Sequence, residues 1–245
     1  MSHVPRVYLP GRLAHGAATI DGEPGRHLAT VLRVRPGDPL LLFAGDGREW
    51  AATITGITKP GVVAEVGELT RQEAPAAVVI ETWCALVRAG RFEWALEKCV
   101  EAGADVIRPI VTEWTQRGDT PSEAKLARWQ RIVVEAAEQS GRLFVPVIES
   151  PAPLAHVLDT YRGALVFGAA EGRPPHELAP LLPDRGHLAI VVGPEGGLSD
   201  EESAALVRHG AIPTSFGPHI LRTETAAVVG TALIRSLAPG MVSST

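Results

Sequence analysis

The chain is poor in cysteine and in aromatic residues, and it has no long apolar run. It contains 245 residues, of which two are cysteine and 5% are aromatic. Cys84 and Cys99 lie in apolar surroundings, which favours buried reduced thiols in a cytosolic protein over a disulfide framework. No stretch of about 18 uninterrupted apolar residues occurs, so we expect no membrane-spanning helix. Residues 1–6 lack the apolar core of a signal peptide, and we therefore expect a cytoplasmic location.

Several signatures of catalytic and binding sites are also missing. The eight histidines are scattered and the two cysteines are not at metal-ligand spacing, so no metal site is expected. The phosphate-binding pattern Gly-x-x-x-x-Gly-Lys-Ser/Thr and the nucleophile pattern Gly-x-Ser-x-Gly do not occur. A nicotinamide-dependent enzyme is disfavoured, because Gly-x-Gly-x-x-Gly is absent and the glycine loop of this chain lies late in the sequence.

Charge is distributed unevenly along the chain. The formal net charge is −5, but residues 1–72 contain eight Lys or Arg and seven Asp or Glu, a net charge of +1, so the remainder carries −6. A local basic surface is sufficient for binding phosphates. The arginines of the first part provide candidates for such a surface, and a solvated face without a ligand explains the same composition. They are Arg6, Arg12, Arg26, Arg33, Arg35 and Arg48.

The first 72 residues have the pattern of a small β-barrel. Turn signals built from Pro, Gly and Asp separate short β-prone segments. Their regular spacing predicts an all-β domain over residues 1–72, with one helix near 27–33 and a linker that begins at Arg71. The β-prone segments lie at 6–9, 39–43, 49–55 and 62–66.

From residue 73 onward the patterns of strands and helices alternate. This alternation predicts an α/β domain with a mostly parallel sheet that is covered on both faces. Thr120 is predicted to cap one of the helices, with Glu123 completing a capping box. Strands are predicted at 78–87, 106–111, 164–167, 188–192 and about 213–216, and helices at 91–102, 120–140, from 199 onward and at 223–236.

Two segments near the C-terminus each run from an apolar strand through a glycine-containing loop into a helix. The first covers residues 191–202 and the second covers residues 216–226. Glycines allow a flat ligand to approach the main chain closely. Loops at the carboxyl ends of strands are also where open α/β sheets bind their ligands. The two loops therefore predict one pocket with a floor made of backbone.

Helix capping explains part of the polar content of these loops. Ser199 and Glu202 have the spacing of a capping box, so we assign both to the start of a helix. Glu195 caps nothing and is a candidate site residue.

In the second segment, Thr223 is the predicted N-cap, with Arg222 before it and Glu224 after it. A surface ion pair between those two residues is the simplest interpretation.

The two loops also carry a resemblance to a known family. Gly-Pro-Glu-Gly-Gly-Leu-Ser at 193–199, followed by Leu-Arg-Thr-Glu-Thr-Ala at 221–226, resembles the RsmE-type 16S ribosomal RNA uridine-N3 methyltransferases of the SPOUT superfamily. The resemblance extends over nearly the whole chain. Further segments that look like the family in the same order lie at 6–8, 27–38, 98–103 and 135–142.

The resemblance implies the architecture and the ligands. It implies a PUA-like RNA-binding barrel over residues 1–72, and over residues 73–245 a SPOUT domain with a deep trefoil knot, present as a homodimer. The implied partner is 16S rRNA or the small ribosomal subunit, contacted through Arg6, Arg12, His27, Arg33 and Arg35. The implied cofactor is S-adenosylmethionine, bound by Gly168, Val192, Gly193, Pro194, Glu195, Gly196, Gly197, Phe216, Gly217, Leu221, Thr225 and Ala226.

The implied reaction transfers a methyl group to N3 of a uridine. N3 carries a proton and is a poor nucleophile until that proton leaves, so the site must align the atoms and assist proton loss. Arg222 is a candidate cation for the uracil oxygens, and Glu224 is a candidate base or a partner that holds Arg222. The target base must also leave its stack to reach such a pocket.

The chain departs from the family pattern at two positions, where His219 replaces a usual arginine and Ala102 replaces a usual leucine. The first departure puts one RNA or cofactor contact in doubt, and the second is explained by packing. Two alternative functions remain at this stage. One is another SPOUT methyltransferase, acting on a ribose 2′-hydroxyl or a different base. The other is a non-catalytic RNA-binding ribosome-assembly factor.

Overall fold

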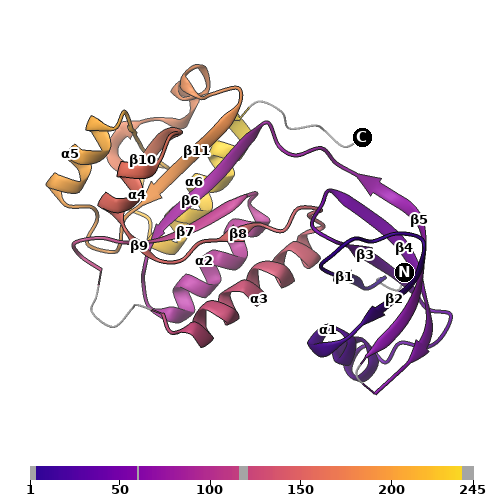
Figure 1. Ribbon diagram of the computed structural model, residues 1–245. Coiled ribbons are helices and arrows are strands. Elements are labelled where there is room, and N and C mark those ends of the chain that lie inside the picture. The colour runs from indigo at the N-terminus through magenta and orange to yellow at the C-terminus, as the bar shows by residue number, and fades with distance from the viewer. Residues whose placement is uncertain (1–3, 60, 116–120, 239–245) are drawn as a thin grey trace. The chain divides into compact units, whose positions relative to one another are not determined.

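The computed structural model describes residues 4–59, 61–115 and 121–238 (Figure 1). The contacts between its elements divide the chain into two compact units. Unit 1 runs through Pro75 and includes Ala137–Val145, whereas unit 2 consists of Ala76–Ala136 and the chain from Pro146 onward. Over the described ranges, no helix combines the length and the apolar content that a bilayer crossing requires.

Unit 1 contains a five-stranded sheet with the order β1-β3-β4-β5-β2. The first pair is parallel and the other pairs are antiparallel. Inward-facing aliphatic side chains from these strands form one core. The strands are β1 (Arg6–Tyr8), β2 (Gly16–Ile20), β3 (Pro39–Phe43), β4 (Arg48–Ile57) and β5 (Val62–Gln72).

Four of these strands confirm the β-prone segments read from the sequence, but β2 was not predicted. Its residues, Gly-Ala-Ala-Thr-Ile, are mostly small, and only its pairing with β5 makes it a strand. The predicted helix near 27–33 is a short α-helix, α1 (Gly22–Arg26), followed by a π-helical turn at His27–Val31. Just beyond this turn Arg33 has a φ of 53°, which non-glycine residues adopt infrequently.

A buried ion pair organises unit 1. The Arg6 Nε donates to the Glu49 carboxylate at 2.5 Å, and the two side chains are only 8% and 4% exposed. The same guanidinium donates to the carbonyl oxygens of Ala137, Glu138 and Arg142, and it lies 3.9 Å from the centre of the Phe43 ring. Arg6 therefore joins β1 to the segment Ala137–Val145, which the chain adds to this unit from a distant part of the sequence.

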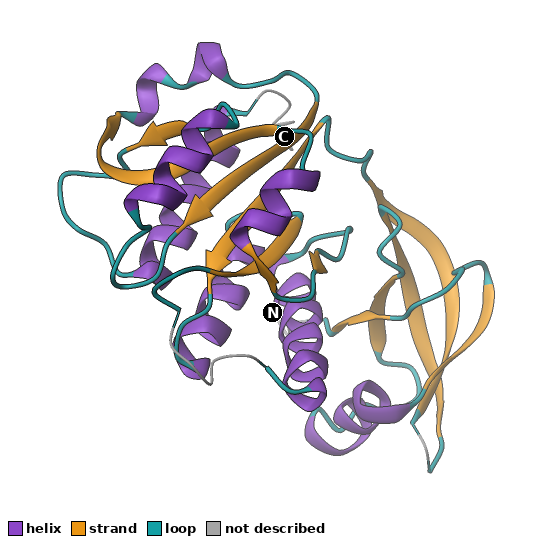
Figure 2. Ribbon diagram, turned by 60° about the vertical axis from the view of Figure 1, so that its left-hand side comes forward, coloured by secondary structure: helices purple, strands orange, loops and turns teal. Residues whose placement is uncertain are grey.

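Unit 2 is built on a parallel sheet with the order β12-β10-β11-β6-β7-β8, in which β9 also pairs with β7. Its continuous apolar runs are typical of strands that are buried on both faces. Figures 1 and 2 show helices on both faces of this sheet. The strands are β6 (Val78–Ala85), β7 (Val106–Val111), β8 (Val147–Ile148), β9 (Ala152–Pro153), β10 (Ala164–Arg173), β11 (Gly186–Val192) and β12 (Ile212–Thr214).

The helices that follow residue 76, of which α3 ends within the part assigned to unit 1, confirm most of the sequence prediction. The helix α5 has the capping box of Ser199 and Glu202 that the sequence predicted. The predicted cap Thr120 lies outside the described residues, and α3 begins at Glu123 with the Ser122 hydroxyl accepting from the Lys125 amide. The helices are α2 (Ala89–Glu101), α3 (Glu123–Ser140), α4 (Leu154–Thr160), α5 (Asp200–Arg208) and α6 (Thr223–Leu237), and two 3₁₀ turns occupy Pro175–Glu177 and Ala179–Leu181.

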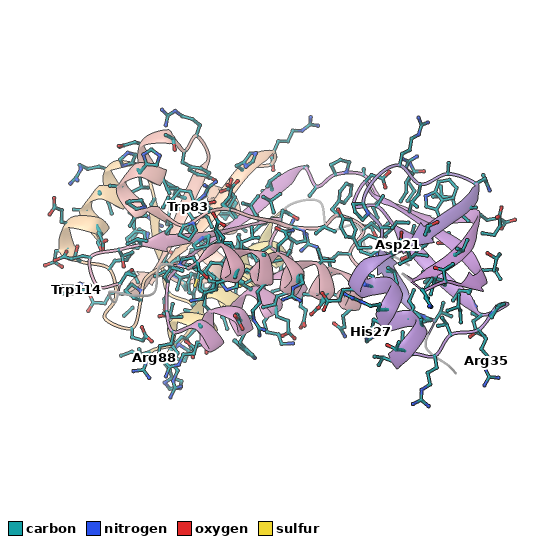
Figure 3. All side chains as sticks on the ribbon, turned by 60° about the horizontal axis from the view of Figure 1, so that its bottom comes forward. Asp21, His27, Arg35, Trp83, Arg88 and Trp114 are labelled. Carbon is teal, nitrogen blue, oxygen red and sulfur yellow. The ribbon has the colours of Figure 1, made fainter. Side chains whose placement is uncertain are left out.

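Successive side chains of β6 point to opposite faces of the sheet and contact different helices. Trp83, labelled in Figure 3, belongs to the core that α4 and α5 cover. Its ring lies 4.8 Å from that of Tyr161. Thr82 faces the other way and shares a hydrogen bond of 2.7 Å with Thr231 of α6. On that face, burial raises the pKa of the Cys99 thiol to about 12. Both cysteines are free and buried, as the sequence indicated.

We expect Arg6→Ala to destabilise unit 1 by about 3–5 kcal/mol, because it leaves the Glu49 carboxylate buried without a partner. The matched control is Arg48→Ala, which removes an exposed arginine from its pair with Asp46 and should cost less than about 1 kcal/mol. Chemical denaturation, with hydrogen exchange of the β1 and β3 amides, measures both. Equal stability of the two variants would contradict a structural role for Arg6.

Candidate functional site

A pocket of about 300 Å³ lies at the ends of β11 and β12, beside residues 168–170 of β10. These three strands are parallel neighbours, so the loops that follow β11 and β12 emerge at the same edge of the sheet, next to the part of β10 where its pairing with β12 is irregular. Both glycine-containing segments predicted from the sequence contribute to this one pocket. It is lined by Gly168, Ala169, Ala170, Val192, Gly193, Pro194, Glu195, Gly197, Leu198, Thr214, Ser215, Phe216, Gly217, Pro218, His219, Ile220, Leu221, Thr223 and Ala226.

The loop after β11 forms a tight turn that keeps main chain at the pocket wall. The Gly197 amide donates to the Pro194 carbonyl at 2.8 Å, and Gly197 has a φ of 78°. A Cβ added at Gly193 would lie 3.0 Å from the Gly197 carbonyl carbon, so the turn folds closely back on itself. At both positions, any larger residue would strain the backbone or displace a neighbour, which explains why Gly193 and Gly197 are glycines.

The loop after β12 is held by the ring of Phe216. A Cβ added at Gly168 would lie 3.1 Å from this ring, and a Cβ added at Gly230 of α6 would lie 2.9 Å from it. Phe216 therefore fits between β10 and α6 only because both neighbours lack a side chain. The aromatic wall of the pocket depends on glycines from two different elements.

The first turn of α6 forms another wall and differs from the prediction. Arg222, with extended backbone angles, is the N-cap, and Thr223 is the first helical residue. The prediction that Thr223 is the N-cap was therefore wrong. Its hydroxyl is buried and finds no hydrogen-bond partner among the described residues. One oxygen of the Glu224 carboxylate, Oε2, is likewise buried without a partner there.

The predicted Arg222–Glu224 ion pair does not form. The Glu224 carboxylate instead faces Arg91 of α2, whose Nε lies 3.9 Å from Oε1. Arg91 also donates from Nη1 to the Glu195 carboxylate at 2.9 Å. In addition to burial and the neighbouring Cys99, the charges of Glu224 and Glu195 raise the pKa of the Cys84 thiol.

Most of the residues predicted to bind the cofactor line the pocket, but Gly196 and Thr225 do not, and neither do Arg222 and Glu224. Sequence reasoning missed nine lining positions, which are Ala169, Ala170, Leu198, Thr214, Ser215, Thr223 and the residues at 218–220. Their places beside the predicted loops were the available signal. It also missed Arg91, for which no local signal existed.

The candidates for RNA binding in unit 1 fall into two groups. Arg12, His27, Arg33 and Arg35 are exposed, and Arg35 extends away from the sheet into solvent (Figure 3). Arg6 is the exception, because its guanidinium is buried among internal acceptors. Close to the exposed arginines, the turn that follows α1 presents Val31 and Leu32, which are 64% and 47% exposed. Among the residues that the structure describes, no group of three or more His, Cys, Asp or Glu is placed to hold a metal ion.

The chain matches known protein families in both units. The model of an RNA methyltransferase domain matches residues 74–235, and the model of an RNA methyltransferase PUA domain matches residues 20–67. The chain is 34% identical over 226 residues to ribosomal RNA small subunit methyltransferase E of Mycobacterium bovis, covering 86% of this chain and 83% of that protein.

Two solved structures resemble the whole chain. A methyltransferase of Legionella pneumophila in complex with its bound cofactor SAM has a TM-score of 0.86 at 30% identity, covering 96% of this chain and 98% of that chain. Ribosomal RNA small subunit methyltransferase E of Neisseria gonorrhoeae, bound to S-adenosyl methionine, has a TM-score of 0.82 at 31% identity with the same coverage.

Gly230→Ala should displace the Phe216 ring, because the added methyl group would overlap it. We expect a loss of about 1–3 kcal/mol in stability. We also expect weaker binding of S-adenosylmethionine, the ligand of both solved relatives, in isothermal calorimetry. Gly56→Ala is the control, since its added Cβ meets nothing within 4 Å. Unchanged affinity in a folded Gly230→Ala variant would show that the Phe216 wall does not contact the ligand.

Proposed function

The chain belongs to the family of ribosomal RNA small subunit methyltransferase E, and we propose that it transfers a methyl group from S-adenosylmethionine to N3 of a uridine in 16S rRNA. The observation that carries the proposal is the convergence of the two glycine loops and the α6 start in one pocket. The family supplies the class of reaction, and this pocket is where we place it. The uridine and its N3 atom are the finer part of the proposal.

The residues of the pocket fit S-adenosylmethionine. Main-chain groups of the 193–198 turn are available to an adenine ring, and the Phe216 and Leu221 side chains offer apolar contact. The buried Thr223 hydroxyl, without a partner in the described chain, is available as a donor or acceptor for a polar ligand. When bound, the cofactor supplies an activated methyl group on its sulfonium. The Glu195 and Glu224 carboxylates give the neighbourhood a negative charge that complements that cation.

Arg222 is the residue that we assign to the uracil. It is exposed at the N-cap of α6, between two pocket-lining residues, and it makes no ion pair among the described residues. Its guanidinium is therefore free to donate to a uracil oxygen as negative charge develops there. Glu224 remains a candidate for accepting the N3 proton, directly or through water. His219, which lines the pocket, stands where the family usually has a second arginine.

The RNA is bound, in this proposal, by the exposed basic residues of unit 1. His27, Arg33 and Arg35 lie in or just after the turn that follows α1, and Arg12 lies in the segment between β1 and β2. Cations contribute affinity through phosphate contacts, and the exposed Val31 and Leu32 side chains offer apolar surface beside them. The target uridine must be unstacked before a pocket of this kind can receive it.

We further propose a homodimer with the knotted topology of the SPOUT superfamily, located in the cytoplasm. The supporting features are an apolar stripe on α6 and Ile220, whose side chain is 96% exposed. A two-fold contact places such a stripe against its own copy. Light scattering after size exclusion measures the mass in solution. The stripe on α6 consists of the partly exposed residues Thr225, Val228, Val229 and Leu233.

The decisive experiment is mass spectrometry of nucleosides from 16S rRNA, isolated from cells with and without the protein. We expect N3-methyluridine to disappear in its absence and to return with purified protein and S-adenosylmethionine in vitro. A ribose 2′-O-methyl product, or a different methylated base, would move the protein to another methyltransferase specificity. Cofactor binding without any RNA product, or no cofactor binding at all, would favour an assembly factor.

Arg222→Ala should reduce turnover about a hundredfold, the order seen when one preorganised donor to a developing charge is removed. Cofactor affinity should change much less, because Arg222 does not line the pocket. Arg222→Lys should restore little activity, since it lacks the planar fork of donors. Arg208→Ala, which removes an exposed arginine from α5, is the control. Methylation by Arg222→Ala at the wild-type rate would end its catalytic assignment.

Arg33→Ala combined with Arg35→Ala should weaken RNA binding and leave cofactor affinity unchanged. A plot of the logarithm of RNA affinity against the logarithm of salt concentration should also be less steep. Its slope should decrease by about one unit for each phosphate that the variant no longer binds. Removing Arg162 and Arg208 from unit 2 subtracts the same charge and serves as the control. If the cofactor affinity of the Arg33/Arg35 variant fell in parallel, these arginines would not be a separate RNA surface.

A further inference from the structure

Arg91 connects two walls of the pocket without lining it. Its guanidinium donates to Glu195, which belongs to the turn after β11, at 2.9 Å. It also lies 3.9 Å from Glu224 in the first turn of α6. Arg91 itself comes from the first turns of α2, so three elements that are distant in the sequence meet at this side chain.

The Arg91–Glu195 pair lies at the surface, with side chains 39% and 46% exposed, and the contact with Glu224 extends it to a largely buried carboxylate. Within the described parts of the chain, Arg91 is the only cation at ion-pair distance from either carboxylate. The Glu224 side chain is 11% exposed, so its charge has little access to water. One guanidinium therefore opposes two carboxylates, and these three groups together carry a formal net charge of −1.

We propose that Arg91 is a positioning residue, which holds the 193–198 turn against the start of α6 so that the cofactor pocket exists before its ligand arrives. This inference rests on the proposed function and extends it to a residue outside both glycine loops. A preformed pocket binds more tightly because less conformational freedom is lost on binding. Arg91 fixes the turn through Glu195 and the helix through Glu224, and it needs no contact with the ligand.

A comparison of two ligands separates positioning from simple electrostatics. S-adenosylmethionine has a cationic sulfonium, whereas its demethylated product S-adenosylhomocysteine has a neutral sulfur. If Arg91 positions the walls, Arg91→Ala weakens both ligands by about fivefold to tenfold, and the ratio of their affinities stays the same. If Arg91 only offsets the carboxylates, its removal leaves a more negative site that gains affinity for the cation relative to the neutral product.

The test uses the full-length protein and calorimetric titration with each ligand. Arg91→Lys keeps the charge and the fold but reaches fewer acceptors, so we expect partial rescue of both affinities. Glu195→Gln should weaken binding in the same direction, and its effect should not add to that of Arg91→Ala. Arg128→Ala, which removes the pair between α3 and Glu93 of α2, is the matched control and should bind normally.

Hydrogen exchange of the ligand-free protein provides a readout that does not depend on the cofactor. Arg91→Ala should accelerate exchange at the amides of the 193–198 turn and of the first turn of α6, with α5 unaffected. Unchanged exchange and unchanged affinities for both ligands would overturn the inference while leaving the proposed function standing. Wild-type protein that binds neither ligand would instead overturn the proposed function, and the exchange result would still decide whether Arg91 orders the two walls.

Discussion

The pocket depends on the position of β11, which lies between β10 and β6 in a sheet of parallel strands. Residues 188–192 of this strand are buried on both faces, so its register is set by core packing. Because its neighbours run in the same direction, the turn that leaves β11 emerges on the same side as the loop that leaves β12, beside residues 168–170 of β10. Displacing this strand would remove the floor of the pocket and the contact that holds its turn.

The absence of side chains shapes the pocket as much as their presence. Gly168 and Gly230 leave room for the Phe216 ring, and Gly197 adopts a backbone conformation that other residues rarely reach. Main-chain groups are therefore available at the wall, as a planar ligand requires. Polar side chains are few, and the Thr223 hydroxyl, which has no hydrogen-bond partner within the described ranges, is the one that most directly indicates a ligand.

Arginine has several different roles in this chain. Arg6 is buried and binds four oxygen acceptors within unit 1, so it stabilises the fold. Arg91 bridges two carboxylates next to the pocket, where a planar guanidinium with several donors is suited to contact both. Arg222 and Arg35 are exposed, and we propose that both contact the substrate. Their burial and partners separate these roles, which residue type alone does not.

Local sequence determined the features that depend on neighbours in the chain. The apolar run before Gly193 marked a buried strand, and the spacing of Ser199 and Glu202 marked a helix start that the structure confirms. Strand β2 escaped prediction because its small residues become a strand only by pairing with β5. The partner of Glu224 also could not be read locally. Arg91 reaches Glu195 across 104 positions of sequence, and only the packing of α2 and α6 on one face of the sheet, next to the end of β11, decides that contact.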